Sequence, residues 1–592
     1  MVVLALGLAG CSVVGAQKSE PAAAVNRYLS ALSHGDVTAA AAGTDDPAGA
    51  ARTLKLVLSE LDPSTSAFTV EYVSETSSTR ARFSYRADWS FGPGRTWAYS
   101  ATGQLRSDAE GWRIVWDPTV VHPRLQEGQS LALTDVSADS AGVLDRQGLP
   151  IMAPQTVTLV NVTPEADDAA AVEQLAGVLA QFDPSITAES LRQQLAAAAG
   201  QTTTVITLRE RDAAGVQARL QAVPGVQLVQ QSRLLSVDPA TSPAALGGLT
   251  KAWQAARDKA AGWRVSIREP DGAVGARLAG GDATTSAEVR TSLDTRIQVA
   301  AQQALATLPR EAALVAIQPS TGQVLAVAQN PKADAQGPIA LTGLYPPGST
   351  FKMITTTAAL QARVATPDTV LPCPGTENIQ GRQIPNESMF DLGAVPLHTA
   401  FARSCNTTLA RLAVGLPADA LRRSGLQLGL GVDYTTPGLT TVTGSVPVAN
   451  EAAQRVESAI GQGTVVASPF GMAMATAAVA AGRVPTPTFL LGQPGAADQT
   501  PPPVPTEVTA AVRKMMRETV TGGTATSIDD IAGLRGKTGT AQYGDGTHSH
   551  GWFVGIDGDL AFAVLVVGGE SSAPAVAAAG RFLRTAADSI PR

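Results

Sequence analysis

The sequence predicts an α+β protein of several domains, and three observations support this fold class. The chain has 592 residues, which corresponds to roughly three to four domains. Residues 24–128 begin with apolar residues at helical spacing and continue as alternating aromatic strands. From about residue 289 the pattern changes, with a helix expected over 297–308 and buried strands over 313–317 and 323–327.

Composition and charge exclude several classes of function. A hydrophobic content of 44% and a mean hydropathy of +0.07 fit ordinary globular cores. The net charge of −7 and the isoelectric point of about 5.4 give no basic footprint for nucleic acid. The five histidines lack metal-ligand spacing, so we expect no metal site.

The N-terminus predicts export and anchoring. Met1 to Ala9 is almost entirely apolar, but it is shorter than the ~20 residues that span a bilayer. Leu8-Ala9-Gly10-Cys11 resembles a lipobox, in which the cysteine is diacylated and becomes the new N-terminus. The alternative is a truncated membrane anchor, and the missing basic region leaves the true start codon open. Both interpretations place the bulk of the chain outside the cytoplasm.

The stretch Tyr345-Pro346-Pro347-Gly348-Ser349-Thr350-Phe351-Lys352 predicts a turn that leads into a helix. Ser349 and Lys352 then lie one turn apart, with Cβ atoms roughly 5–6 Å apart. A serine hydroxyl needs a neighbouring base to become a nucleophile, and a neutral lysine is such a base when burial and nearby cations lower its pKa. Backbone donors at the helix start can receive an oxyanion.

Two further motifs follow in the chain, Ser404-Cys405-Asn406 and Lys537-Thr538-Gly539-Thr540. Together with Ser349-x-x-Lys352 they stand in the order found in penicillin-binding proteins and related β-lactamases. The chain therefore resembles a penicillin-binding protein of the monofunctional class B type, a D,D-transpeptidase. Cys405 stands where related motifs carry Asp, but the Ser-x-Asn form is common in this family.

The resemblance implies four segments. They are a signal, lipobox and tether over 1–23, an NTF2-like domain over 24–128, an extended dimerisation or pedestal domain over 129–280, and a penicillin-binding transpeptidase domain over 281–592, which is similar to serine β-lactamases and has a central antiparallel sheet flanked by helices. The aromatics of the NTF2-like domain fit a ligand pocket or, more simply, the core of its sheet. Asp145 and Arg146 are expected to be structural ion-pair partners rather than catalytic residues.

The resemblance also implies the chemistry. The substrate is a peptidoglycan stem peptide that ends in D-Ala-D-Ala, and no metal or organic cofactor is needed. The implied catalytic residues are Ser349 as the nucleophile, Lys352 as its base, Ser404 and Asn406 as a proton relay and amide holder, and Lys537 as a nearby charge. The implied substrate-binding residues are Thr538, Gly539 and Thr540, with the backbone N–H groups of Ser349 and Thr540 as the oxyanion hole.

Two alternatives stay open. A β-lactamase or D,D-carboxypeptidase would need a base that activates water, and the sequence has no matching glutamate motif. A non-catalytic penicillin-binding scaffold or sensor would not need the intact motif end groups. For a transpeptidase we expect β-lactams as covalent inhibitors, a membrane glycan polymerase as a partner, and a location on the extracytoplasmic face of the bacterial cell membrane.

The cysteines leave one question of pairing. With Cys11 acylated, Cys373 and Cys405 are an even pair outside the cytoplasm. A disulfide between them and two buried free thiols are both consistent with the sequence, because nothing in it fixes their separation. The sequence also leaves open whether the protein serves cell division, elongation or sporulation, and it leaves open the acceptor amine, the oligomeric state and the role of the N-terminal domain.

Overall fold

The computed structural model describes residues 20–592 apart from 140, 164–167, 239–240 and 242. Its contacts divide the chain into two compact units, each of which is described by itself here. The first unit comprises residues 1–140 and 257–287, and the second comprises 141–256 and 288–592. This division runs through the 129–280 region, and the four segment limits expected from the sequence stay predictions.

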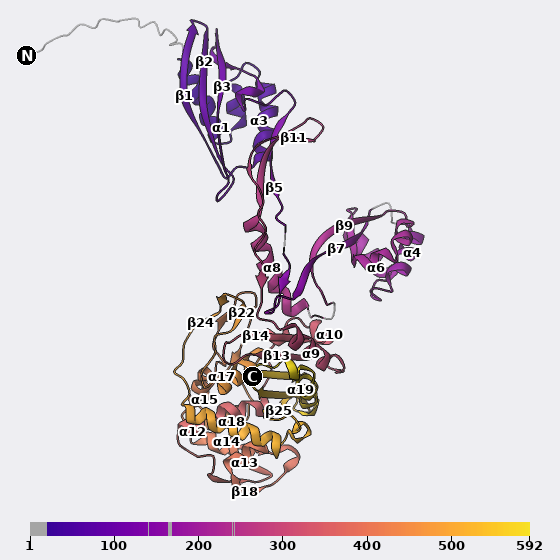
Figure 1. Cartoon of the computed structure of the whole chain (residues 1–592), viewed down its shortest axis with the longest axis vertical. Coiled ribbons are helices and arrows are strands. Elements are labelled where there is room, and N and C mark those ends of the chain that lie inside the picture. The colour runs from indigo at the N-terminus through magenta and orange to yellow at the C-terminus, as the bar shows by residue number, and fades with distance from the viewer. Residues whose placement is uncertain (1–19, 140, 164–167, 239–240, 242) are drawn as a thin grey trace, which may run out of the picture. The chain divides into compact units, whose positions relative to one another are not determined.

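The first unit has three helices followed by a four-stranded antiparallel sheet in the order β1-β2-β3-β4 (Figure 1). The elements are α1 (Pro21–Ser33), α2 (Val37–Ala42), α3 (Pro47–Leu61), β1 (Thr65–Ser77), β2 (Arg80–Ser90), β3 (Thr96–Asp108) and β4 (Gly111–Val115). A three-stranded sheet in the order β11-β10-β5 completes the unit, from β5 (Ser130–Val136), β10 (Gly262–Arg268) and β11 (Val274–Gly281).

Local sequence explains these elements. Asp36 and Asp46 precede α2 and α3, and each carboxylate accepts a backbone N–H three residues on, at 2.9 and 3.0 Å. The aromatic residues of β2 alternate, so that Phe83, Tyr85 and Trp89 are buried together with the apolar face of α1. The interpretation of these aromatics as sheet core is confirmed.

The second unit begins with a small α/β subdomain. Its long strand β7 (Pro150–Val162) pairs antiparallel with β8 (Thr203–Arg209) and β9 (Val226–Ser236). Four helices complete a separate hydrophobic cluster with these strands, namely α4 (Ala169–Leu179), α5 (Ala188–Ala197), α6 (Glu210–Ala214) and α7 (Gln217–Gln221). The helix α8 (Pro243–Ala260) follows β9.

A five-stranded antiparallel sheet in the order β14-β13-β27-β26-β25 organises the rest of the second unit. Its strands are β13 (Ala312–Ile317), β14 (Val324–Gln329), β25 (Arg535–Tyr543), β26 (His548–Asp557) and β27 (Leu560–Val566). The expected hairpin at the start of this domain is β13 and β14. Both faces of β13, β14 and β27 are buried, which requires cover on each side of the sheet.

Helices supply that cover. The helices α9 (Thr295–Ala306) and α19 (Ala573–Ala586) share one hydrophobic cluster with the sheet. The helix α17 (Pro469–Ala481) packs with the other face and is buried over most of its length. Further helices extend this side: α12 (Lys352–Gln361), α13 (Leu397–Ala402), α14 (Asn406–Val414), α15 (Ala420–Gln427), α16 (Ala452–Ala459) and α18 (Thr506–Thr521).

Short elements complete the chain. Two ribbons precede α13, namely β15 (Val370–Cys373) with β18 (Gly393–Pro396), and β16 (Thr376–Ile379) with β17 (Arg382–Pro385). The other short strands and helices are β6 (Val143–Leu144), β12 (Val289–Arg290), α10 (Pro331–Asp334), α11 (Ile339–Thr342), β19 (Tyr434–Thr435), β20 (Gly444–Ser445), β21 (Val466–Ala467), β22 (Thr488–Leu490), β23 (Gln493–Pro494) and β24 (Ala496–Ala497).

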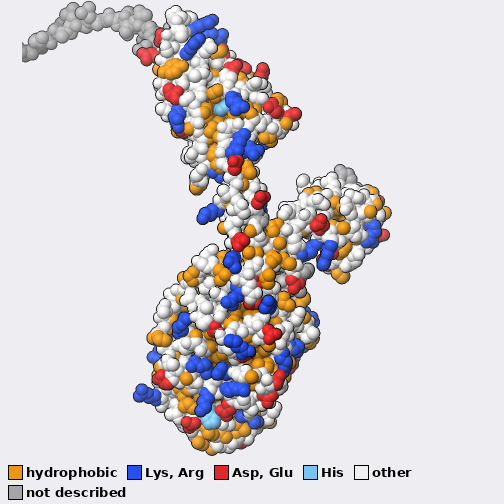
Figure 2. All heavy atoms as spheres, viewed as in Figure 1, with side chains coloured by type: hydrophobic (Ala, Val, Ile, Leu, Met, Phe, Trp, Pro, Cys, Tyr) orange, Lys and Arg blue, Asp and Glu red, His pale blue; other side chains and the backbone are white. Residues whose placement is uncertain are grey.

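The surface charge and the lengths of the helices relate to the predicted membrane anchoring. On the face drawn in Figure 2, side chains of Lys and Arg are interspersed with those of Asp and Glu over both units. Across the described part of the chain, no helix has the length and apolar composition needed to cross a bilayer. Cys11, the expected lipidation site, lies outside the described residues.

Candidate active site

The first motif lies at a helix start, as its sequence predicts. Gly348–Phe351 forms a short 3₁₀ turn, and α12 continues from Lys352. Gly348 has a φ of +53°, and a Cβ there would come within 2.5 Å of the Thr540 carbonyl oxygen. Gly348 also donates its N–H to the Gly461 carbonyl at 3.0 Å. The turn that carries Ser349 is therefore held directly against β25.

Lys352 joins the first motif to the second. Its side chain is fully buried, and its Nζ lies within hydrogen-bond distance of the Asn406 Oδ1 at 2.6 Å, the Ser404 carbonyl oxygen at 2.8 Å and the Ser404 Oγ at 3.3 Å. Ser349 is half-buried, and within the described structure no hydrogen bond joins its hydroxyl to Lys352. Catalytic hydrogen bonds are often long in a free enzyme and tighten when substrate binds.

Burial and charge set the protonation of the two motif lysines. Burial lowers the pKa of Lys352 well below its usual value, and the charge of Lys537 lowers it further. Burial also lowers the pKa of Lys537, to about 7. Glu387 opposes both shifts, because its negative charge favours the protonated lysines. A neutral Lys352 beside a partly charged Lys537 is the combination that a serine nucleophile requires.

Lys537 is held close to the second motif. Its Nζ donates to the Thr538 carbonyl at 3.1 Å and lies 5.6 Å from the centroid of the Phe401 ring, on the helix that leads to Ser404. The contact with the ring offsets part of the cost of burying a cationic lysine. The third motif thus approaches the second from the side of the sheet.

Ser404 adopts a strained backbone conformation between α13 and α14. Its φ of +61° lies in the left-handed region, which is uncommon for a residue with a Cβ. Two backbone hydrogen bonds hold this turn, from Ser404 N–H to the Phe401 carbonyl and from Cys405 N–H to the Ala400 carbonyl. Strain of this kind persists only where the surroundings determine the conformation, and it concentrates at functional sites.

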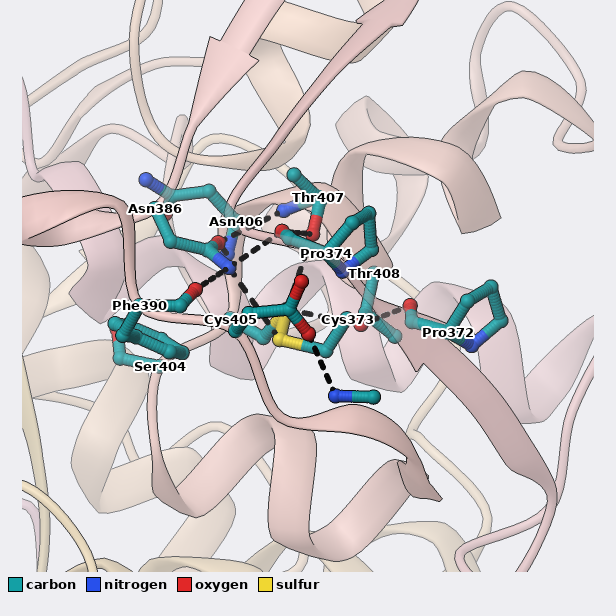
Figure 3. Close-up of a disulfide and its surroundings, with 12 residues drawn as sticks. Pro372, Cys373, Pro374, Asn386, Phe390, Ser404, Cys405, Asn406, Thr407 and Thr408 are labelled. Carbon is teal, nitrogen blue, oxygen red and sulfur yellow. Dashed lines mark hydrogen bonds between the residues drawn. A yellow bond between two sulfur atoms is a disulfide. The ribbon is translucent and has the colours of Figure 1, made fainter.

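A disulfide between Cys373 and Cys405 determines part of those surroundings (Figure 3). Both cysteines are fully buried, and the bond joins the end of β15 to the middle residue of Ser404-Cys405-Asn406. Of the two states that the sequence left open, the structure has the disulfide.

The residues of the third motif lie on β25, the edge strand of the sheet. The Thr538 hydroxyl shares a hydrogen bond of 2.6 Å with the Thr524 hydroxyl, whereas Thr540 is half-buried. A Cβ at Gly539 would come within 2.9 Å of the Pro347 carbonyl oxygen and of the Thr350 methyl group. Glycine is therefore needed here for the close approach of the Ser349 turn.

Comparisons with known proteins agree with this geometry. Residues 312–586 match the model of the penicillin binding protein transpeptidase domain, and residues 20–129 match that of the NTF2-like N-terminal transpeptidase domain. The chain is 30% identical to the peptidoglycan D,D-transpeptidase PbpA of Mycobacterium tuberculosis in an alignment 342 residues long that covers 48% of this chain and 67% of that protein. The chain belongs to the class B penicillin-binding proteins.

Two further relatives extend the similarity. The peptidoglycan D,D-transpeptidase MrdA of Acinetobacter baumannii is 28% identical in an alignment 308 residues long that covers 44% of this chain and 45% of that protein. Penicillin-binding protein 3 of Bacillus subtilis is 22% identical in an alignment 539 residues long that covers 78% of each chain. The latter alignment includes most of the chain outside the transpeptidase domain.

One residue important to the site of this penicillin-binding protein was missed in the sequence. Asn386 is buried, and its Oδ1 accepts the N–H groups of Asn406 at 2.7 Å and Thr407 at 3.3 Å (Figure 3). Its Nδ2 donates to the carbonyls of Pro374 and Phe390, both at 2.9 Å. Asn386 therefore caps α14 from another part of the chain, and no local cap signal precedes α14 in the sequence.

His550 lies on β26, opposite Ala541 of β25. His550 stacks on Tyr543 with ring centroids 4.1 Å apart, and its Nδ1 accepts the Gly568 N–H at 3.3 Å. Burial lowers the pKa of His550 to about 4, so the ring is neutral at physiological pH. In the described ranges no group of His, Cys, Asp and Glu residues has the arrangement of a metal site.

Proposed function

We propose that this chain is a peptidoglycan D,D-transpeptidase that cross-links stem peptides through an acyl-serine intermediate. One observation carries the proposal. A buried lysine of depressed pKa lies one turn from Ser349 and shares its Nζ with Ser404 and Asn406. The names of PbpA and MrdA support the same reaction and the same class of substrate.

The first half-reaction forms an ester. The Oγ of Ser349 attacks the carbonyl carbon of the penultimate D-Ala, and neutral Lys352 takes the hydroxyl proton. The C–N bond to the terminal D-Ala then breaks, and the proton reaches the leaving amine through Lys352 and Ser404. Asn406 holds the peptide amide, and the N–H groups of Ser349 and Thr540 receive the oxyanion.

The second half-reaction forms the cross-link. The amine of a second stem peptide attacks the ester carbonyl, a new amide forms, and Ser349 Oγ regains its proton. The charge of Lys537 attracts the terminal carboxylate of the donor and helps to keep Lys352 neutral. The hydroxyls of Thr538 and Thr540 bind that carboxylate. A β-lactam that resembles D-Ala-D-Ala acylates Ser349 in the same way.

The location and partners belong to the same proposal. A lipid or membrane anchor at Cys11 holds the enzyme on the extracytoplasmic face of the cell membrane, and a membrane glycan polymerase supplies the strands to be cross-linked. The Cys373–Cys405 disulfide supports an oxidising compartment. Mass spectrometry of the N-terminal peptide from membrane-extracted protein tests the anchor, because a diacylglyceryl thioether on Cys11 changes its mass.

The lifetime of the acyl-enzyme separates transpeptidation from hydrolysis. A hydrolase needs a base placed roughly 2.6–3.2 Å from the attacking water. Lys352 is already bonded to Ser404 and Asn406, so we expect rapid acylation by penicillin and an adduct that lasts many minutes or longer. Electrospray mass spectra recorded over time measure the lifetime of this adduct. Return of the unmodified mass within seconds would indicate a β-lactamase or a carboxypeptidase instead.

A further inference from the structure

The outer edge of β25 offers backbone groups to a bound peptide. Along an antiparallel strand, alternate residues direct both their N–H and C=O groups to the same side. Thr538, Thr540 and Gln542 direct theirs away from β26, because the Thr538 carbonyl accepts from Lys537 Nζ and the Thr540 carbonyl lies beside Gly348. A donor peptide that adds to this edge would meet these three residues in turn.

The groups of Gln542 are already occupied. The side-chain amide of Gln462, with its oxygen and nitrogen assigned from their hydrogen-bond partners, accepts the Gln542 N–H at 2.9 Å and donates to the Gln542 carbonyl at 3.3 Å. One side chain thus makes the pair of hydrogen bonds that a neighbouring strand would make. Since the Thr538 carbonyl is bonded to Lys537, Thr540 is the residue of the three whose outward pair has no hydrogen bond within the described structure.

Gln462 is held in place next to the nucleophile. The preceding Gly461 has a φ of +72°, and its carbonyl accepts the Gly348 N–H at 3.0 Å. The backbone N–H of Gln462 donates to the Glu457 carbonyl at 3.1 Å, at the end of α16. The loop therefore joins the Ser349 turn to the edge of β25, and the Gln462 side chain is half-buried.

We propose that Gln462 is a specificity-determining residue that ends the pairing of the donor peptide with β25 at Thr540. This inference rests on the proposed function. With the donor carboxylate near Lys537 and Thr538, the donor runs antiparallel to β25, and its residues before the reacting D-Ala extend toward Gln542. The donor residue two positions before the reacting D-Ala reaches Gln542, whose backbone N–H and C=O are already bonded to Gln462.

The end of backbone pairing at Thr540 determines which donors can gain from added length. A donor whose regular α-peptide backbone continues past that position gains no hydrogen bond from its extra length. A donor that is short there, or that leaves the strand through a side-chain linkage, loses nothing. The site therefore gives a plain extended peptide no advantage over a branched or γ-linked stem peptide.

Two ester donors with a D-lactate leaving group test the inference on the full chain. In both donors D-Ala is esterified to D-lactate and takes the place of the penultimate D-Ala of the stem peptide. The short donor has an acetyl group on the nitrogen of this D-Ala, and the long donor has three further α-linked residues on the same nitrogen. Release of D-lactate gives kcat/KM for each donor. The wild-type protein is expected to give a long-to-short ratio near one, whereas Gln462→Ala frees two backbone groups and is expected to raise the ratio about three- to tenfold.

Control measurements separate the outcomes. Gln361→Ala removes another half-buried glutamine, which bonds to Ser424 and Gln427 of α15, and is expected to keep the wild-type ratio. Gln462→Met keeps the side-chain length without bonding Gln542, and is expected to change the ratio in the direction of the alanine variant. Penicillin acylation is measured on every variant, and the variants are compared by their long-to-short ratio because a general loss of acylation affects both donors and cancels in the ratio.

The inference is wrong if both Gln462 variants take up penicillin normally and keep the wild-type ratio, or if the wild-type protein already favours the long donor. Failure of the wild-type protein to form a penicillin adduct at Ser349 would instead contradict the proposed function. The two failures are therefore distinguishable.

Discussion

Substitution of Asn386 by alanine tests how the second motif is held. The change removes the cap of α14, which accounts for about 1 kcal/mol. It also removes the donor to two carbonyls, and each lost hydrogen bond accounts for about 1 kcal/mol. We expect a loss of about 2–4 kcal/mol of stability in the transpeptidase domain, below the 5–15 kcal/mol typical of a folded domain.

The same substitution is expected to slow acylation. Asn386 fixes the backbone of Asn406, whose Oδ1 accepts from Lys352 at 2.6 Å. A loosened Asn406 leaves Lys352 less well oriented toward Ser349. We expect the second-order rate constant for penicillin acylation to fall about tenfold, which corresponds to about 1.4 kcal/mol in the transition state.

Thermal unfolding and stopped-flow acylation measure the two effects. Asn378→Ala is the matched control, because Asn378 is an exposed asparagine of β16 that bonds only to the nearby Gly381 N–H among the contacts described. It should change stability by less than about 1 kcal/mol and leave acylation unchanged. Wild-type stability and acylation in Asn386→Ala would refute the role of Asn386 as the anchor of α14.

Three other perturbations have defined outcomes. Acylation by penicillin is expected to slow as the pH rises through about 7. Below its pKa Lys537 carries the charge that attracts the penicillin carboxylate, and above its pKa that charge is lost. A stopped-flow rate that keeps rising above neutral pH would contradict this assignment. The double substitution of Cys373 and Cys405 by serine is expected to cost about 2–4 kcal/mol and to slow acylation, and an unchanged melting temperature would argue against the disulfide as a constraint on Ser404. Gly461→Ala places a Cβ 2.1 Å from the Gly348 carbonyl oxygen, at a residue whose φ is +72°. The clash would displace the Ser349 turn, so penicillin labelling should be largely lost. Full labelling would show that the Ser349 turn tolerates this displacement.

Much of the fold and of the site could be predicted from the sequence. Two apolar runs joined by a turn signal identified the hairpin of β13 and β14, and the motifs identified Lys352, Ser404 and Asn406 as candidates, which the structure brings together. These features could be predicted because each signal is local, either an apolar run along a strand or a short motif.

Other features could not be predicted, because their partners lie far apart in the chain. Asn386 caps a helix that begins twenty residues later. Asp145 was expected to form an ion pair, and this was wrong: its buried carboxylate accepts the N–H groups of Gln147 and Leu149 and the hydroxyl and N–H of Thr295. A turn carboxylate and an ion-pair carboxylate look alike in a sequence, because only the fold determines which donors surround it.

The nucleophile is the central claim, and intact mass spectrometry tests it most directly. The wild-type protein and Ser349→Ala are each incubated with excess penicillin, desalted and weighed. We expect the wild-type protein to gain the mass of one penicillin at Ser349, located by peptide mapping, and the variant to fold normally and keep its own mass. An adduct of equal yield on Ser349→Ala, or one mapped to another serine of the wild-type protein, would contradict the account.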